Sequence, residues 1–536
     1  MKRHTLFLIL LLVCSGLSAR KTAWKRPLMG WSSWNAYMTL INDSIIRHQA
    51  DMVVRSGLRD AGYAQVNIDD GFFGPRDAQG RMTPNPERFP NGLKVVADYI
   101  HSLGMKAGIY SDAGANTCGS YYNNDAMGTN GGLYGHDLED MDRYFNEWGY
   151  DFFKLDYCGG QKAGLDEETR YRQIRHRIDS IARHPVAFNI CRWAYPGTWV
   201  SEAGDSWRVT HDIRPNWKNI RGIVDDCLYL SAYCRNGRYN DMDMLCIGYS
   251  KDNQCGLCDG PDPTILTKDF LTPDEEDAHF GIWCIMASPL LVGCKIEAMP
   301  KRSLNLLLNR ELIALNQDPL CQQAHVVQHV GETYVLTKDL LRHEGPRRAV
   351  CLYNPTDSPT LMTVSAAELG YTGNMRVRDL LRHTDLAPTD RIQLTVPAHG
   401  VQMLRTEGRR IETNRYEAEW AFMPQYSEIR KSPVYRPVEE ASGRMVADCL
   451  GGEGNTLVWE NVYSRKGGQY DLTLHTTATS QPDQVTPIHL QVNGQEVTPD
   501  RGTYRVRLHK GYNVVTLSSP GNMPAIDYLD VHRVIK

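Results

Sequence analysis

Short apolar runs alternate with amphipathic stretches from residue 28 to about residue 310. Short apolar runs are typical of buried strands, whereas apolar residues at every third or fourth position are typical of helices. Helices are expected at residues 44–61, 90–103, 138–148 and 167–183. Strands are expected at residues 28–31, 64–68, 107–110, 152–155, 186–190, 207–209, 244–247 and 285–291. This strand–helix rhythm predicts an α/β fold of the (β/α)₈ TIM-barrel type.

A doubly wound sheet is the main alternative fold. It is disfavoured because Trp31-Ser-Ser-Trp34-Asn35 follows the first strand, where a Gly-rich dinucleotide turn would be expected. Polar residues also follow most of the strands, and in a barrel the carboxyl ends of the strands meet at one mouth. This placement argues against the alternative that these carboxylates lie on solvated faces of helices. The residues at these strand ends are Asp69, Asp70, Asp112, Asp156, Cys191, Arg192, Arg208, Asp212, Asp241 and Asp243.

The helical rhythm stops after about residue 315, and short strands with turns between them are expected at 333–336, 348–353, 375–379 and 392–396. Residues 407–415 are charged and poor in apolar side chains, which is typical of a linker. We therefore predict a catalytic barrel over 20–314, an antiparallel β-sandwich domain over 315–406 and a C-terminal β-sandwich (jelly-roll) module over 416–536.

The N-terminus has the features of a secretory signal. Lys2, Arg3 and His4 precede an apolar run at 6–13, and small residues follow up to Ala19. We expect residues 1–19 to be removed and the protein to be secreted or periplasmic, with lipoprotein anchoring through Cys14 as the alternative. No later stretch reaches ~18 uninterrupted apolar residues, so no transmembrane segment is expected.

Composition and charge exclude few classes of binding partner. Apolar residues make up 42% of the chain and charged residues 23%, as in ordinary globular proteins, and the net charge is −4. This balance gives no electrostatic reason to expect nucleic acid or an anionic membrane as a partner. The chain has 14 cysteines, of which Cys255 and Cys258 form a CxxC. Without a second pair or nearby histidines, a loop disulfide or two free thiols is favoured over a zinc site.

Asp156 ends the fourth predicted strand in Phe-Lys-Leu-Asp-Tyr-Cys158. A buried carboxylate costs free energy unless it has a partner or a function. Lys154 lies two positions earlier and faces the same side of the strand. It could hold Asp156 ionised, as a carboxylate nucleophile requires. A purely structural Lys–Asp pair explains the pattern equally well.

Asp212 follows the sixth predicted strand and would face Asp156 across the mouth of the barrel. Glycosidases use two such carboxyl groups, one on each side of the bond that is cleaved. The remaining acids and aromatic residues suit a sugar pocket, since carboxylates accept from vicinal hydroxyls. The alternative for Asp70 and Asp112 is helix capping. For Trp34 it is packing in the core.

Six motifs in order resemble glycoside hydrolase family 27, the α-galactosidases and α-N-acetylgalactosaminidases. The similarity extends over roughly residues 27–400. The motifs are Met29-Gly-Trp-Ser-Ser-Trp-Asn35, Asn67-Ile-Asp-Asp70, Gly108-Ile-Tyr-Ser-Asp112, Lys154-Leu-Asp-Tyr-Cys158, Trp207-Arg208 with Asp212-Ile213, and Asn240-Asp-Met-Asp-Met244.

The resemblance implies a retaining enzyme with Asp156 as nucleophile and Asp212 as acid and base. It implies that Asp69 and Asp70 bind the 4- and 6-hydroxyls and that Lys154 binds the 3- and 4-hydroxyls. Arg208 would lie near the 2-hydroxyl, and Cys118 and Cys158 would form a disulfide. The other implied pocket residues are Trp34, Tyr110, Cys191, Arg192, Trp193 and Asp243. No cofactor is implied for catalysis.

Two departures from the family pattern concern the rim of the pocket. Asp70 is followed by Gly71-Phe-Phe73, where many members have a cysteine. Arg192 stands where α-galactosidases typically have Glu and acetylgalactosaminidases Ser, in the loop that contacts carbon 2 of the sugar. Guanidinium only donates hydrogen bonds. Arg192 therefore donates to an oxygen, pairs with a neighbouring acid or points outward.

The C-terminal residues resemble carbohydrate-binding modules of families 6 and 35. The motifs are Tyr416-Glu-Ala-Glu419, Gly467-Gly-Gln-Tyr470, Val492-Asn-Gly494 and Ile526-Asp-Tyr528. The resemblance implies a structural Ca²⁺ held by Glu417, Glu419 and either Asp527 or Asp530, because hard oxygen ligands suit this ion. The alternative is a β-rich appendage that packs on the enzyme and binds no sugar.

The leading functional hypothesis is an exo-acting retaining α-galactosidase on galactose-containing oligo- or polysaccharides. β-L-Arabinopyranosidase or α-N-acetylgalactosaminidase activity with the same acid pair is the alternative. A non-catalytic sugar-binding protein would be expected to lack one of the two acids, and both Asp156 and Asp212 are present.

Overall fold

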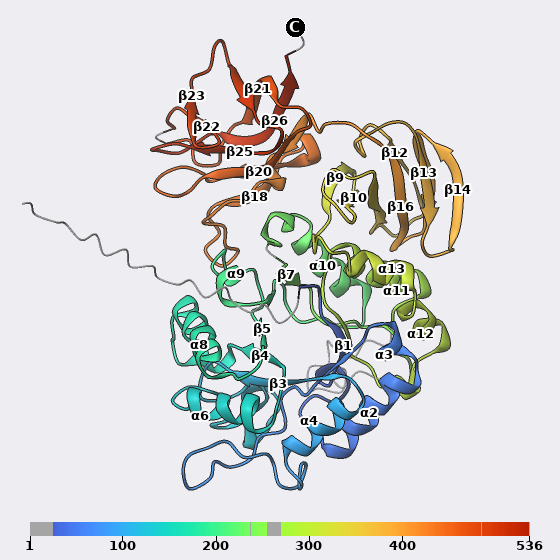
Figure 1. Cartoon of the computed structure of the whole chain (residues 1–536), viewed down its shortest axis with the longest axis vertical. Coiled ribbons are helices and arrows are strands. Elements are labelled where there is room, and N and C mark those ends of the chain that lie inside the picture. The colour runs from blue at the N-terminus through green and yellow to red at the C-terminus, as the bar shows by residue number, and fades with distance from the viewer. Residues whose placement is uncertain (1–24, 236, 254–269, 484, 535–536) are drawn as a thin grey trace, which may run out of the picture.

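The computed structural model describes residues 25–235, 237–253, 270–483 and 485–534. The expected signal with Cys14 and the Cys255–Cys258 pair lie outside these residues. The chain forms three successive units, a mixed helix–strand unit followed by two units of strands (Figure 1). None of the helices in the described ranges is long and apolar enough to cross a membrane.

An eight-stranded parallel sheet forms the first unit, with the order β7-β6-β5-β4-β3-β2-β1-β8. A parallel bridge between Leu245 and Val292 joins the segment after β7 to β8. The sheet therefore curls until its edges meet, in the manner of a TIM barrel, and we call this unit the barrel-like domain. Its strands are β1 (Met29–Ser32), β2 (Gln65–Asn67), β3 (Lys106–Asp112), β4 (Phe152–Asp156), β5 (Ala187–Ile190), β6 (Ser206–Arg208), β7 (Tyr239–Asp241) and β8 (Leu290–Val292).

The helices of this domain follow the expected pattern, with one interruption. The helix expected at 44–61 is two helices, because Gly57 between them has a φ of +84°, a value that favours glycine. The Asn42 side chain caps the first of them by accepting from the N–H of Ile45. The helices are α1 (Trp34–Tyr37), α2 (Asp43–Arg55), α3 (Leu58–Ala61), α4 (Leu93–Ser102), α5 (Cys118–Tyr122), α6 (Asp137–Asp142), α7 (Cys158–Lys162), α8 (Glu167–Ile181), α9 (Val200–Ala203), α10 (Trp217–Cys227), α11 (Pro273–Ile285), α12 (Lys301–Leu307) and α13 (Arg310–Asn316).

The last two strand predictions were wrong in position. The seventh strand is Tyr239–Asp241, and the apolar residues 244–247 follow it with a single bridge at Leu245. The eighth strand is Leu290–Val292, because the residues up to Ile285 belong to α11. Helix α11 is buried on nearly all sides, so its sequence lacks the apolar stripe that distinguishes a surface helix from a strand.

The middle unit is an antiparallel β domain. Its six-stranded sheet has the order β14-β13-β16-β11-β10-β9, and β12 pairs with β15 separately. Strand β16 continues to Arg410, so the connection to the next unit is residues 411–414, shorter than the expected linker. The strands are β9 (His325–Val330), β10 (Thr333–Asp339), β11 (Arg347–Asn354), β12 (Thr360–Ser365), β13 (Tyr371–Asp379), β14 (Thr384–Thr389), β15 (Arg391–Val396) and β16 (Gly400–Arg410).

The C-terminal unit is a second antiparallel β domain. One sheet has the order β18-β19-β26-β21-β24, with β17 also paired to β26, and the other has the order β20-β25-β22-β23. The first and last strands of the unit are thus neighbours. The strands are β17 (Arg415–Glu417), β18 (Val434–Pro437), β19 (Met445–Asp448), β20 (Leu457–Ser464), β21 (Gly468–Thr477), β22 (His489–Val492), β23 (Gln495–Val497), β24 (Thr503–Leu508), β25 (Gly511–Ser518) and β26 (Ala525–Arg533).

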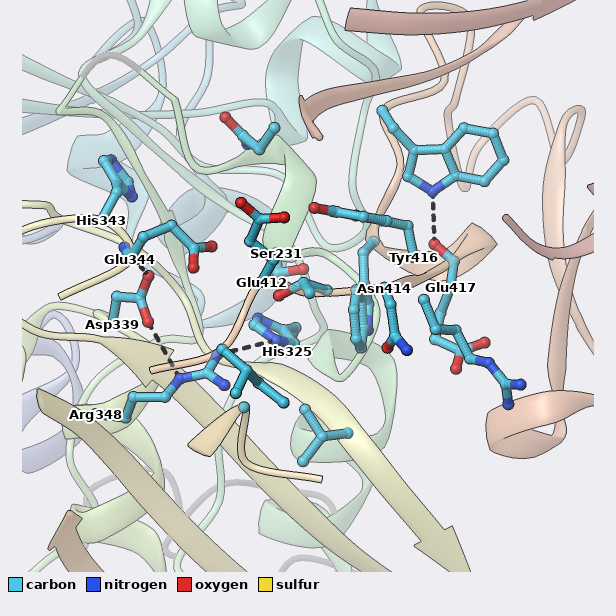
Figure 2. A pocket seen from close by; sticks show the side chains of 18 of the residues that line it. Ser231, His325, Asp339, His343, Glu344, Arg348, Glu412, Asn414, Tyr416 and Glu417 are labelled. Carbon is cyan, nitrogen blue, oxygen red and sulfur yellow. Dashed lines mark hydrogen bonds and ion pairs between the residues drawn. The ribbon is translucent and has the colours of Figure 1, made fainter. Parts of the chain in front are cut away.

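The three units meet around a polar cavity of about 630 Å³. Ser231 comes from the barrel-like domain, Arg348 from the middle domain and Tyr416 from the C-terminal domain (Figure 2). Asp156 and Asp212 do not line it. Its acids are largely engaged by neighbours: Asp339, for example, lies 3.1 Å from the Arg348 guanidinium. We interpret this cavity as the junction of the three domains.

Candidate active site

Asp156 ends β4 and is the most deeply placed of the expected catalytic residues, with 7% of its surface exposed. The hydroxyl of Tyr110, on the neighbouring strand β3, donates to Asp156 Oδ2 at 2.9 Å. Asp156 Oδ1 is buried and has no hydrogen-bond partner. Tyr110 therefore orients one carboxylate oxygen, while the other lies buried without a hydrogen-bond partner.

Burial raises the pKa of Asp156, because it disfavours the charged carboxylate. The positive charge of Lys154 opposes this effect, and the negative charge of Asp69 adds to it. Hydrogen bonds from Cys191 and Tyr110 also lower the pKa of Asp156. The ionised form thus depends on several neighbours at once.

Lys154 pairs directly with Asp69 rather than with Asp156. Its Nζ donates to Asp69 Oδ2 at 2.9 Å and lies 5.4 Å from the centre of the Tyr110 ring. Burial lowers the pKa of Lys154, but Asp69 and Asp156 outweigh burial and raise it well above the ordinary value. Lys154 is therefore a cation at neutral pH, and its charge favours the charged form of Asp156.

Asp70 and Asp112 are fully buried and accept hydrogen bonds from backbone N–H groups. Asp70 accepts from Gly119 at 2.7 Å and from Gly71 at 2.8 Å. Asp112 accepts from Gly114 at 2.6 Å and from residues 159 and 160 at the start of α7. Burial raises the pKa of each acid to about 7. Both side chains thus hold rim loops in place, although the N-cap positions of α5 and α7 are Thr117 and Tyr157.

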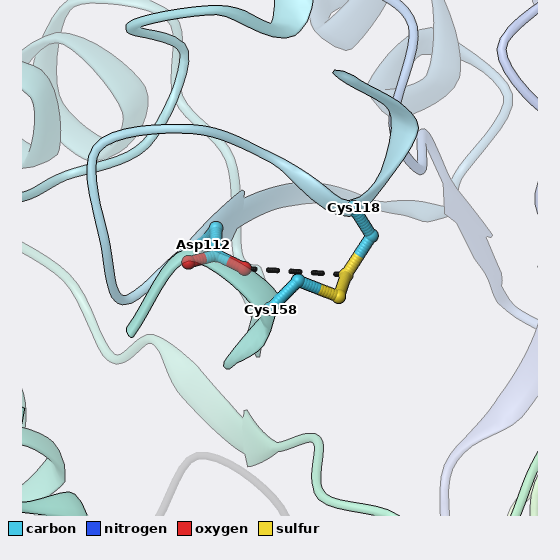
Figure 3. A group of neighbouring side chains, drawn as sticks. All are labelled: Asp112, Cys118 and Cys158. Atoms are coloured by element: carbon cyan, nitrogen blue, oxygen red, sulfur yellow. Dashed lines mark hydrogen bonds between the residues drawn. A yellow bond between two sulfur atoms is a disulfide. The ribbon is translucent and has the colours of Figure 1, made fainter. Parts of the chain in front are cut away.

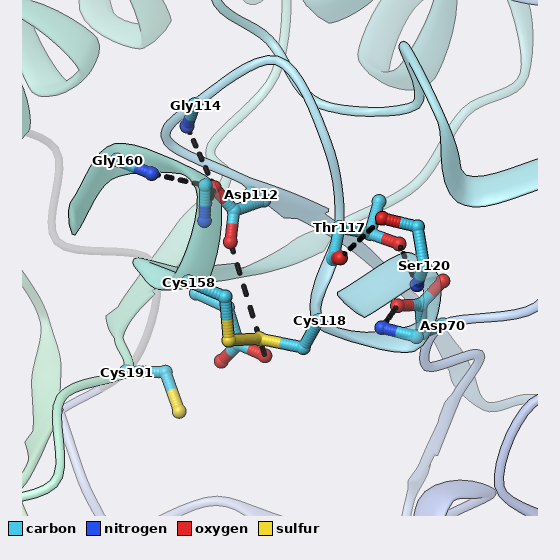
Figure 4. Close-up of a disulfide and its surroundings, with 12 residues drawn as sticks. Asp70, Asp112, Gly114, Thr117, Cys118, Ser120, Cys158, Gly160 and Cys191 are labelled. Atoms are coloured by element: carbon cyan, nitrogen blue, oxygen red, sulfur yellow. Dashed lines mark hydrogen bonds between the residues drawn. A yellow bond between two sulfur atoms is a disulfide. The ribbon is translucent and has the colours of Figure 1, made fainter. Parts of the chain in front are cut away.

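Cys118 and Cys158 form the expected disulfide, which joins α5 to α7 (Figure 3). Asp112 lies beside it, but both sulfurs are bonded to each other and offer no thiolate to a metal ion. Figure 4 shows Asp70, Asp112 and Cys191 around this disulfide. Cys191 and Cys449 are among the free thiols in the described part of the chain.

Asp212 lies in the loop after β6, and 43% of its side chain is exposed. Arg208 Nη2 lies 3.1 Å from Asp212 Oδ1 and 3.0 Å from Asp243 Oδ2. Asp243 also accepts from the N–H of Ile213 at 2.9 Å, and its φ of +78° is strained for a residue with a side chain. Asp243 therefore holds both Arg208 and the residue that follows Asp212.

The surroundings of Asp212 favour its charged form. Burial raises the pKa of Asp212, but the guanidinium of Arg208, together with Lys154 and Arg214, brings it below the ordinary value. Asp156 and Asp212 are thus shifted in opposite directions. Both shifts are opposite to those that the expected roles need, since a nucleophile acts in its charged form and an acid in its protonated form.

Arg192 pairs with an acid that the sequence reasoning missed. Its Nε donates to Glu167 Oε1 at 2.9 Å, and its guanidinium lies 5.1 Å from the Tyr157 ring and 5.6 Å from the Trp193 ring. Of the three expectations for Arg192, pairing with a neighbouring acid is the one found. No signal in the sequence singles out Glu167, because an acidic residue in the first turn of a helix such as α8 is common.

Several of the predicted residues face one small cavity of about 30 Å³ at the centre of the barrel-like domain. Its volume is about that of one water molecule. Of the expected site residues, Asp69, Lys154, Arg208 and Asp243 line it. The missed residue Asn189 also lines it and donates to Asp241 Oδ2 at 2.8 Å. Cys191 is buried beside Arg208, whereas Trp34 and Trp193 are only partly buried.

A second cluster of acids lies in the C-terminal domain. Glu417 Oε1 accepts from the Ser442 hydroxyl, and Asp527 Oδ1 accepts from the Ser442 N–H. Glu417 Oε2 and both carboxylate oxygens of Glu419 are buried without a hydrogen-bond partner. Asp530 contacts Arg415 and His475 instead. Ser442 therefore links Asp527, rather than Asp530, to Glu417, although the carboxylate oxygens of Glu417, Glu419 and Asp527 do not all lie within 4.8 Å of one another.

Known proteins are similar to most of this chain. The family model described as Alpha galactosidase A matches residues 23–318, and the Alpha galactosidase C-terminal beta sandwich domain matches residues 330–406. Alpha-galactosidase 3 of Arabidopsis thaliana is 36% identical over 386 residues, 71% of this chain and 81% of the relative. Alpha-galactosidase A of Cellvibrio japonicus is 32% identical over 410 residues, 72% and 93% of the two chains.

A solved structure agrees with these sequence matches. Alpha-galactosidase I from Mortierella vinacea has a TM-score of 0.62 at 27% identity, over 73% of this chain and 98% of its own. Both matching family models end by residue 406, before the C-terminal domain begins.

Proposed function

The chain belongs to the Alpha galactosidase A family, and on that premise we propose that it is a retaining exo-α-galactosidase with the (β/α)₈ fold. The observation that carries the assignment of roles is the difference between the two acids. Asp156 is buried and keeps one oxygen unpartnered, whereas Asp212 is partly exposed at the rim. A nucleophile belongs at the closed end of an exo-acting pocket, and an acid belongs where the leaving group departs and water enters.

The proposed reaction has two steps. Asp156 Oδ1 attacks the anomeric carbon, the bond to the leaving oxygen breaks, and Asp212 gives that oxygen its proton. A covalent galactosyl ester of Asp156 results. In the second step Asp212 takes a proton from water, the water oxygen bonds to the anomeric carbon, and the ester bond breaks. The product keeps the α configuration, and both acids return to their starting states.

Galactose is the proposed sugar because Asp69 and Lys154 place an acceptor and a donor side by side near Asp156. The family resemblance assigns the 3-, 4- and 6-hydroxyls to Lys154, Asp69 and Asp70. Asp70, however, is fully buried and already accepts from Gly71 and Gly119. This observation supports β-L-arabinopyranosidase as the second candidate, since arabinopyranose lacks the hydroxymethyl arm.

A panel of nitrophenyl glycosides on the purified protein tests the proposal. We expect the α-galactoside to be hydrolysed with much higher kcat/KM than the β-L-arabinopyranoside and the α-N-acetylgalactosaminide, with α-galactose released first. A preference for the arabinopyranoside would replace the leading assignment by the second candidate. Release of β-galactose as the first product would rule out the retaining mechanism. Natural substrates are proposed to be galactose-containing oligo- or polysaccharides.

For the C-terminal domain we propose a carbohydrate-binding module of the family 6 and 35 type that holds a structural Ca²⁺. The supporting observation is the set of unpartnered buried oxygens on Glu417 and Glu419. Such oxygens are costly unless a cation or a proton satisfies them. Glu417, Glu419 and Asp527 would supply hard oxygen ligands. The ion would then stabilise the junction between the first and last strands of this domain.

We further propose that the mature protein is secreted or periplasmic after removal of residues 1–19. The support is the signal-like sequence of residues 2–19. Sequencing the N-terminus of the exported protein tests this proposal. A blocked N-terminus at Cys14 carrying lipid would show lipoprotein anchoring instead.

A further inference from the structure

A segment of the C-terminal domain lies against the rim of the candidate active site. This segment, residues 424–431, precedes β18 and extends away from its own sheets to the barrel-like domain. Figure 1 shows the chain before β18 reaching the region of α9 and β5. It contacts the loop that joins β5 to α9, residues 191–199, which we call the rim loop. The rim loop begins at Cys191 and contains Arg192 and Trp193.

Each hydrogen bond between the two segments has a backbone group on at least one side. The N–H of Glu428 donates to Tyr195 O at 3.1 Å, and the N–H of Tyr195 donates to Glu428 Oε2 at 3.3 Å. The Ser427 hydroxyl donates to Pro196 O at 2.7 Å. In the opposite direction, the Thr198 hydroxyl donates to Pro424 O at 2.6 Å. The C-terminal domain thus makes hydrogen bonds to three residues of the rim loop, Tyr195, Pro196 and Thr198.

Stacked aromatic rings pack at this contact. The ring of Tyr195 stacks on that of Tyr426 at 5.5 Å, and Tyr426 in turn stacks on Tyr233 at 4.9 Å. Tyr195 is 1% exposed. Stacked rings and buried, satisfied backbone groups are typical of a permanent interface rather than of a tethered appendage.

The other side of the rim loop is held by the barrel-like domain itself. Arg192 pairs with Glu167 at the start of α8, and Arg430 of the C-terminal segment lies 3.7 Å from the adjacent Glu168. At its beginning, Cys191 lies against Arg208, which contacts Asp212. The rim loop is therefore clamped between α8 and the C-terminal domain, directly beside the catalytic pair.

We propose that residues 424–431 of the C-terminal domain are a positioning element of the catalytic pocket. They fix the rim loop, and with it the part of the pocket that contacts carbon 2 of the sugar and the leaving group. This inference rests on the proposed α-galactosidase function. Because only a loop is positioned, the element acts on substrate binding more than on the chemical step.

The experiment uses the full chain and the double variant Ser427→Ala/Glu428→Ala, which removes one donor and one acceptor from the clamp. Glu428→Gln is the conservative variant, since its amide oxygen can still accept from Tyr195. The matched control is Arg444→Ala. It removes a hydrogen bond from the same domain to Gly331 O in the middle domain, away from the rim loop. Kinetics with a galacto-oligosaccharide and amide hydrogen exchange of residues 192–199 are measured on all four proteins.

For the double variant we expect KM for the oligosaccharide to rise about fivefold to tenfold while kcat stays within about twofold, as the loss of one or two hydrogen bonds implies. We also expect faster exchange of residues 192–199, with Glu428→Gln and Arg444→Ala like the parent. Unchanged KM and unchanged exchange would overturn the proposal, as would an equal rise of KM in the Arg444→Ala control. A parent protein that hydrolyses no α-galactoside would refute the proposed function instead, while the exchange measurement would still test the clamp.

Discussion

Arg208 lies 3.1 Å from Asp212 and uses the same nitrogen to contact Asp243 at 3.0 Å. The acid–base candidate is thus attached to a buried cation that is itself held by a second acid. This arrangement favours the charged form of Asp212, the form that takes a proton from water in the second step of the proposed reaction. In the first step Asp212 must carry a proton, so Arg208 sets the pH range in which the enzyme can begin a turnover.

Replacing Arg208 by Gln is expected to move the alkaline limb of the kcat/KM profile to higher pH. Removal of the cation raises the pKa of Asp212, so the protonated acid persists to higher pH. The maximal kcat/KM is expected to fall, because Asp243 loses its partner. The pH dependence of kcat/KM measures both effects. Arg208→Lys, which keeps the charge, should retain the parent's alkaline limb; an equal displacement in both variants would contradict the explanation.

Asp156→Asn is expected to lower kcat by about 10⁴-fold or more, since an amide cannot form the glycosyl ester. Asp212→Asn is expected to cost about 10²–10⁴-fold on substrates with poor leaving groups, and much less on nitrophenyl substrates. Steady-state kinetics on a galacto-oligosaccharide and a nitrophenyl galactoside give both numbers. Equal losses on the two substrates for Asp212→Asn would argue against its role as the acid.

Tyr110→Phe tests the hydrogen bond that orients the nucleophile. Its hydroxyl lowers the pKa of Asp156 from Oδ2, so its removal raises that pKa and moves the acidic limb of kcat/KM to higher pH. Near neutral pH, kcat/KM is expected to fall about tenfold, the usual effect of losing one hydrogen bond to a charged group. Tyr504→Phe in the C-terminal domain serves as the control. A parent-like acidic limb in Tyr110→Phe would show that the hydroxyl does not influence Asp156.

The double variant Cys118→Ser/Cys158→Ser is expected to lower the free energy of unfolding by about 2–4 kcal/mol, because the unfolded chain gains freedom in the loop that the disulfide closes. Denaturant unfolding with and without a reductant measures the loss. Cys449→Ser, which replaces a free and partly buried thiol, is the matched control and should behave like the parent. Reductant should have little effect on the double variant. A reductant effect as large as in the parent would mean that another disulfide carries the stabilisation.

Calcium is expected to raise the Tm of the protein, and a chelator is expected to lower it. Binding to the folded state alone contributes about 2.7 kcal/mol at a ligand concentration of 100 Kd. Glu419→Gln should remove the response, because Glu419 contributes two unpartnered buried oxygens. Thermal unfolding in chelator and in Ca²⁺ checks this, with the exposed Glu496→Gln as the control. A calcium response that survives in Glu419→Gln would place the ion elsewhere.

The order of the strands and the acids at their ends were predictable from local pattern. The positions of the first six strands follow from short apolar runs, and Asp156 is identified because it directly ends one of them. Helix α11 and strand β8 were misassigned, since a helix that is buried on nearly all sides has no polar face to reveal its period. The pairing of Cys118 with Cys158 came from the family motifs and is present in the structure.

The sequence by itself thus predicted the fold class, the acids at the strand ends and, through its motifs, the disulfide, because these depend on local periodicity and on motifs of a few residues. Only the tertiary structure decided what those side chains contact. Asp70 accepts from backbone N–H groups, and Arg192 donates to Glu167. Tyr195 of the rim loop donates to Glu428, which lies more than 230 positions further along the chain. Such contacts join segments that are distant in the chain, and no local pattern records them, because their free energy arises only when the domains pack together.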